Sequence, residues 1–120
     1  MNLTSFINLK LKENAEIVEI TKNQIYPVCA ESDTTGNYIV FQQDNQDPKY
    51  SQDSLRRNKK TSLTARIYIV SQDYDKAVEI LEKVTNILED AGCEYTSLYN
   101  EDYDQIHEYY VIETQIKKRI

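Results

Sequence analysis

The densest group of side chains that could do chemistry lies near the C-terminus, where four carboxylates surround the single histidine. The group comprises Glu101, Asp102, Asp104, His107 and Glu108. Asp102 and Asp104 would share one face of a strand, and carboxylate oxygens are ligands of hard cations. We expect a hairpin turn here, however, where carboxylates are usually hydrated. We therefore predict no metal site, and no general acid or base, which would need a perturbed pKa.

Other catalytic patterns are missing from the sequence. Cys29 and Cys93 form no CxxC motif and there is one histidine, which excludes the usual zinc spacings and argues against a disulfide framework. Gly36 and Gly92 are the two glycines, so neither a GxSxG elbow nor a phosphate-binding loop can be written. Cys93 is expected to be a small buried hydrophobic residue. We predict a protein that is not an enzyme and binds no cofactor.

Tyrosine is the unusual residue, with ten copies against two phenylalanines and no tryptophan. Half of them lie in the C-terminal hairpin, namely Tyr95, Tyr99, Tyr103, Tyr109 and Tyr110. Tyrosine is enriched at protein interfaces, but alternate tyrosines can also simply cover a half-exposed sheet. Both interpretations stay open. If there is an interface, its candidate aromatic residues are Tyr99, Tyr103 and Tyr109.

Charge is distributed unevenly along a chain of net charge −6. Residues 71–110 contain eleven acidic residues and two lysines, a net charge of −9, whereas Arg56, Arg57, Lys59 and Lys60 form a basic block. This balance argues against a protein that grips duplex nucleic acid, because clustered cations supply phosphate affinity. Separate patches of opposite sign suit contacts between subunits, and the basic block is a candidate interface. Solvated loops are the simpler alternative.

A length of 120 residues fits one domain over residues 1–120. Periodicity predicts that its N-terminal region is helical. Leu3, Phe6, Ile7 and Leu11 recur at helical spacing, and Asn14 looks like the cap of a second short helix. This region contains neither a signal peptide nor an apolar run that could span a bilayer, so the expected location is cytoplasmic. Residues 24–28 are at best a short edge strand, since Pro27 cannot donate to a ladder.

Strand and helix patterns then alternate along the chain. Strands are predicted at residues 38–41, 63–70, 93–99 and 106–116, with a polar hairpin turn at 100–104 and with Ile106, Tyr110, Ile112 and Ile116 on one face. A long helix begins after Ser71 or Asp73 and ends before Gly92. Its apolar stripe comprises Ala77, Ile80, Leu81, Val84, Ile87, Leu88 and Ala91.

The expected fold is α+β: a mostly antiparallel four-stranded sheet packed by the long helix and a short N-terminal helix. Residues 44–60 are polar and follow neither period, which predicts a long projecting loop or hairpin arm. We expect this arm to be mobile in an isolated protomer and to order against a partner, because it lacks apolar residues that would offset the ordering entropy.

The chain resembles the tail-completion, or tail-terminator, family of tailed phages and prophages over about residues 20–118. The resemblance rests on the order of elements and on Ile25-Tyr26-Pro27-Val28, Tyr38-Ile39-Val40-Phe41, the strand 63–70, and Tyr74-Asp75-Lys76-Ala77 at the start of the long helix. The family often has proline before the first tyrosine of the second stretch, where this chain has Asn37.

The resemblance implies an assembly protein that forms a homo-oligomeric ring, of six subunits, which terminates the tail tube and joins it to the head. Its partners would be further copies of itself, the tube and the head–tail connector, with DNA as passing cargo and no membrane. It would reside in the virion tail, and in the host cytoplasm during assembly. The alternative function, from a different class, is an acidic inhibitor or DNA mimic that occupies a nucleic-acid-binding site.

Overall fold

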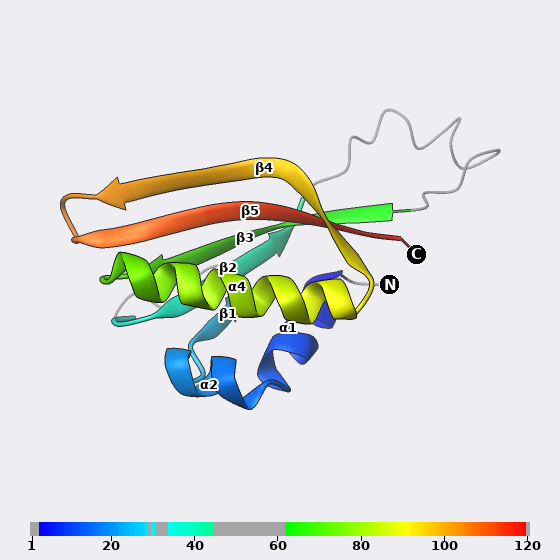
Figure 1. The fold of residues 1–120 in the computed structure, drawn as a ribbon, viewed down its shortest axis with the longest axis horizontal. Coiled ribbons are helices and arrows are strands. Elements are labelled where there is room, and N and C mark those ends of the chain that lie inside the picture. Colours follow the sequence, from blue (N-terminus) through cyan, green and yellow to red (C-terminus); the bar gives the residue numbers. More distant parts are fainter. Residues whose placement is uncertain (1–2, 29, 31–33, 45–61, 120) are drawn as a thin grey trace.

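The computed structural model describes residues 3–28, 30, 34–44 and 62–119, which form a single sheet with helices on one face (Figure 1). The strands are β1 (Ile25–Pro27), β2 (Tyr38–Gln43), β3 (Ser62–Ser71), β4 (Cys93–Asp104) and β5 (Tyr109–Arg119). Their order is β1-β2-β3-β5-β4, with β1 parallel to β2 and the other pairs antiparallel. The α+β class is confirmed.

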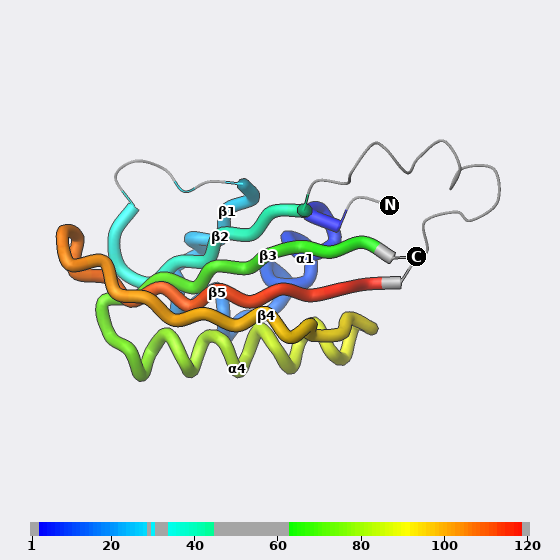
Figure 2. The backbone as a smooth tube through the Cα atoms, turned by 90° about the horizontal axis from the view of Figure 1, so that it is seen from above, coloured from blue at the N-terminus to red at the C-terminus, as the bar shows by residue number. Residues whose placement is uncertain are grey.

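Three helices of the described chain cover one face of this sheet. They are α1 (Leu3–Lys12), α2 (Ala15–Thr21) and α4 (Tyr74–Asp90), and α1 and α4 lie side by side beneath the strands (Figures 1 and 2). Alternate residues of β3 and β5 point toward them and are buried, such as Ile67, Ile69 and Ile112. The other face of the sheet carries no helix of the described chain.

The sheet has five described strands, so the prediction of four was wrong. The additional strand is β1, which the sequence allowed only as a short edge strand. Pro27 is tolerated because β1 is the outermost strand and its free edge needs no donor. Ile25 is buried against the core, which explains why so short a segment is held in place.

The C-terminal hairpin turns later than the sequence suggested. Strand β4 continues through residues 100–104, which were predicted as the turn, and the chain reverses at residues 105–108 instead. The Asp104 carboxylate accepts hydrogen bonds from the backbone N–H groups of Ile106 and His107, and Glu108 adopts a left-handed φ of 61°. Ile106 therefore lies in the turn, 87% exposed, and not on the buried face of a strand.

The termini of α4 are those predicted, and its buried stripe is narrower. Asp73 is the N-cap, and its carboxylate accepts from the backbone N–H of Asp75 at 3.0 Å. Gly92 follows the helix with φ +93°. Ala77, Ile80, Val84 and Leu88 are buried. Three further members of the predicted stripe are partly exposed at its margins, namely Leu81, Ile87 and Ala91.

Candidate assembly surface

The end of the β4–β5 hairpin extends beyond the first turn of α4 (Figure 1). This part of the molecule carries exposed aromatic and apolar side chains. Of the six large hydrophobic side chains that are exposed in the described chain, four lie on or beside this hairpin: Tyr74, Tyr99, Tyr103 and Ile106. Exposed apolar side chains that gather in one place mark interaction sites more often than scattered ones do. The hairpin end is therefore the candidate assembly surface.

Glu101 is held in a fixed position on this surface by two tyrosines. Strand register places Tyr99, Glu101 and Tyr103 on the helix side of β4. The hydroxyls of Tyr74 and Tyr99 each donate to Oε2 of Glu101 at 2.5 Å. These hydrogen bonds lower the pKa of the Glu101 carboxyl, with the bond from Tyr74 first, so the group is ionised at neutral pH. The bond to Glu101 also raises the pKa of Tyr99 to about 12.

Replacing Glu101 with Gln is expected to lower the pKa of Tyr99 toward its ordinary value of 10. The reason is that a neutral amide, unlike a carboxylate, does not repel the negatively charged tyrosinate. In the wild-type protein, this interaction stabilises the fold fully below pH 10. Its contribution is lost as the pH rises toward 12, through the raised pKa. An alkaline NMR titration of labelled tyrosine rings measures the change.

Tyr95 serves as the internal control in the same titration, since burial raises its pKa to about 12 without involving Glu101. The Tyr95 resonance is expected to titrate identically in both proteins. An unchanged Tyr99 titration in the Glu101→Gln variant would contradict the hydrogen-bonded arrangement.

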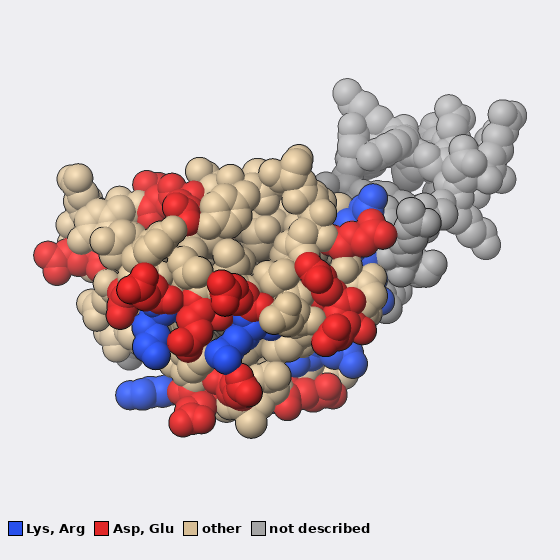
Figure 3. Space-filling model, viewed as in Figure 1, with Lys and Arg blue, Asp and Glu red and all other residues tan. Residues whose placement is uncertain are grey.

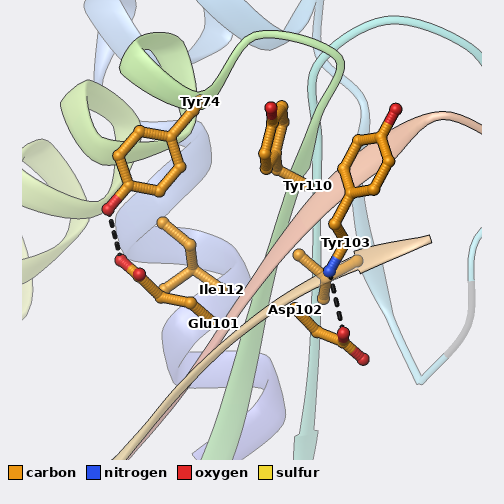
Figure 4. A pocket seen from close by; sticks show the side chains of 7 residues that line it. Tyr74, Glu101, Asp102, Tyr103, Tyr110 and Ile112 are labelled. Atoms are coloured by element: carbon orange, nitrogen blue, oxygen red, sulfur yellow. Dashed lines mark hydrogen bonds between the residues drawn. The ribbon is translucent and has the colours of Figure 1, made fainter. Parts of the chain in front are cut away.

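Beside Glu101 the surface is hollowed by an aromatic-walled cavity of about 260 Å³. Tyr110 lies between Tyr74 and Tyr103 (Figure 4). Its ring centroid is 5.5 Å from that of Tyr74 and 4.7 Å from that of Tyr103. The carboxylate of Glu101 closes one side of this hollow. The arrangement joins aromatic faces to a negative charge, which suits a cationic group.

The predicted interface tyrosines do not all share one face of the sheet. Tyr109 pairs with Asp104 and lies on the helix-free face, opposite to Tyr99 and Tyr103. There its ring meets the ring of Tyr38 at 6.0 Å, edge to face. It is half-buried, so part of its surface is used within the protomer. The sequence did not indicate that Tyr74, Glu101 and Tyr110 lie together, because Tyr74 is distant in sequence from the hairpin.

Polar groups also occupy the helix-free face. Arg66 bridges two carboxylates there, with Nε 3.2 Å from Asp44 and Nη1 3.1 Å from Glu113. The single positive charge of Arg66 thus offsets one of the two negative charges of Asp44 and Glu113. The positive charge of Arg66 is therefore already paired within the protomer.

The acidic surface predicted for residues 71–110 spreads over α4 and the hairpin (Figure 3). Lysines compensate part of it: Lys83 bonds to Glu16 at 2.5 Å, and Lys76 lies 3.9 Å from Glu79. The basic candidate residues Arg56, Arg57, Lys59 and Lys60, and most of the predicted arm, lie outside the described residues.

The other residues that the sequence offered for chemistry, Asp104, His107 and Cys93, have contacts or burial that stabilise the fold. Asp104 caps the turn and lies 2.8 Å from Nδ1 of His107. Across the described ranges, no three His, Cys, Asp or Glu side chains converge as a metal site would require. Cys93 is buried, and burial raises the pKa of its thiol, which disfavours the nucleophilic thiolate. No helix within the described residues is long and apolar enough to cross a membrane.

Comparison with known proteins gives a likeness in structure but none in sequence. No family model and no curated protein matches the sequence. A solved chain described as "Virion of native gene transfer agent (GTA) particle" has a similar structure, with a TM-score of 0.75 and 13% sequence identity. The similarity covers 98% of this chain and 93% of that chain. At this identity, the likeness shows a shared fold.

Proposed function

We propose that this protein is a non-enzymatic structural component of a phage-like virion, in which it forms a ring that terminates the tail tube and joins it to the head. The observation that carries the proposal is the shared fold with a chain of a gene transfer agent virion, over nearly the full length of both chains. The resemblance of the element order to tail-completion proteins supports the position at the tail, and a ring of six subunits.

The mechanism needs geometry and no bond-breaking chemistry. A ring seated on the last layer of the tube occupies the surface to which further tube subunits would add, so growth stops, and its opposite side is free for the head–tail connector. Such a ring needs two different complementary surfaces on every protomer. The exposed hairpin end is one candidate surface. Acidic residues facing the channel would let DNA pass without adhering to the wall.

Native mass spectrometry and negative-stain electron microscopy of the full chain test this function directly. We expect self-association that increases with protein concentration, rings of six subunits, and binding of these rings to the ends of assembled tail tubes. Tubes grown with the protein present should be shorter than tubes grown without it. A protein that stays monomeric at high concentration and ignores tube ends would contradict the proposal and favour an acidic inhibitor.

A further inference from the structure

We propose that the hollow formed by Tyr74, Glu101, Tyr103 and Tyr110 is a receptor for a basic side chain from residues 56–60 of a second copy of this chain. This inference rests on the proposed ring and identifies the contact that would close it. The hollow lies wholly within described residues, and its occupant is the basic block of Arg56, Arg57, Lys59 and Lys60.

The carboxylate in the hollow, that of Glu101, forms no ion pair within the described chain. Five carboxylates of the described chain have a lysine or arginine within 4 Å, namely Glu16, Asp44, Glu79, Glu94 and Glu113, and Glu101 is not among them. Both tyrosine hydroxyls donate to its Oε2, which orients the carboxylate and leaves Oε1 for a further donor. A carboxylate that is already oriented loses little freedom on binding, so an incoming guanidinium or ammonium group binds it more tightly.

The aromatic walls favour the same guest. Tyr74 is 39% exposed and Tyr103 is 42% exposed, so both rings present accessible surface beside the carboxylate. Tyr110 packs against both of them and fixes their separation. A cation that enters can lie against a tyrosine face while it pairs with Glu101, and each interaction strengthens as water is displaced.

The chain between Ser62 and the nearest lysines, Lys59 and Lys60, is too short for these lysines to reach the hollow of their own protomer. Glu101 is level with Ile112 and hence with Ile69, seven residues along β3 from Ser62, which is roughly 23 Å. Lys59 and Lys60 precede Ser62 by at most three residues, so backbone and side chain together reach about 16 Å. Lys59 and Lys60 can therefore meet this hollow only in another protomer, as a head-to-tail contact requires.

Zero-length carbodiimide cross-linking tests this pairing, since it joins a carboxylate to a lysine amine in direct contact. We expect a bond between Glu101 and Lys59 or Lys60 in a mixture of unlabelled and ¹⁵N-labelled protein, with half of the linked peptides carrying mixed labels. Linked peptides that join only equal labels would place the contact within one protomer and overturn the proposal.

Glu101→Gln and Glu82→Gln form a matched pair for the same question. Each removes one negative charge from an exposed position, but Glu82 lies on α4 away from the hollow. The amide introduced by Glu101→Gln can still accept the tyrosine hydroxyls, so the fold should persist. We expect Glu101→Gln to weaken self-association by about tenfold, and Glu82→Gln by less than about threefold.

The outcomes separate this contact from the ring itself. Rings that form equally well in both variants would overturn the receptor proposal while leaving the proposed function intact. A wild-type protein that forms no oligomer at any concentration would contradict both. Sedimentation velocity at low and high salt gives the association constants, and circular dichroism confirms that each variant is folded.

Discussion

Replacing Arg56, Arg57, Lys59 and Lys60 together with Glu is expected to convert assembled rings into monomers without unfolding them. The four residues lie within five consecutive positions, in a chain whose residues 71–110 carry a net charge of −9. Reversing the block turns attraction between neighbouring subunits into repulsion at every interface of a ring. Exposed pairs contribute only about 0.2–1 kcal/mol each, but a closed ring repeats them at each contact.

Sedimentation velocity over a range of salt concentrations measures this effect. Wild-type rings should weaken as salt rises, because ions screen exposed charges beyond about 10 Å at 0.1 M. The quadruple variant should stay monomeric at all salt concentrations and keep the wild-type circular dichroism spectrum.

A second quadruple variant separates the location of the charges from their number. Replacing Lys10, Lys12, Lys22 and Lys76 with Glu lowers the net charge by the same eight units, at positions on α1 and α4 and at the C-cap of α2. We expect this protein to retain most of its assembly. If both variants dissociate alike, general repulsion between acidic protomers governs the result, and the basic block is only a solvated loop.

Truncating Ile80 to Ala should give the largest loss of stability among changes in α4. Ile80 is fully buried in the core between α4 and the sheet, so the substitution removes packed methyl groups and leaves a cavity. Such changes cost about 2–5 kcal/mol. That is a large share of the roughly 5–15 kcal/mol that stabilises a typical domain.

Leu81 is the matched comparison one residue later. The sequence pattern placed it in the same stripe, but its side chain is only partly buried against the core. We expect Leu81→Ala to cost about 1 kcal/mol, since part of that surface already contacts water. Urea denaturation of both variants measures the difference. Equal losses would mean that α4 is rotated from the orientation described above.

The sequence alone determined the elements whose signals are local. The stripe through Ala77, Ile80, Val84 and Leu88 repeats at the helical period, and an Asp cap and a glycine with positive φ bound it, so α4 could be predicted at both termini. Strand β3 alternates buried and half-buried residues from Leu63 to Ile69, and this period of two predicted residues 63–70 as a strand. Period and capping depend on neighbours in the chain, which a sequence displays directly.

Tertiary structure decided the rest, because the determining contacts join residues distant in sequence or use unusual local chemistry. The hairpin turn contains no glycine or proline, so nothing in its composition located it; the Asp104 side chain and the left-handed Glu108 form it. That shift extended β4 and carried Glu101 to the hydroxyl of Tyr74, 27 residues away. The hollow exists only where β4, β5 and the first turn of α4 meet, and sequence periodicity carries no information about that meeting.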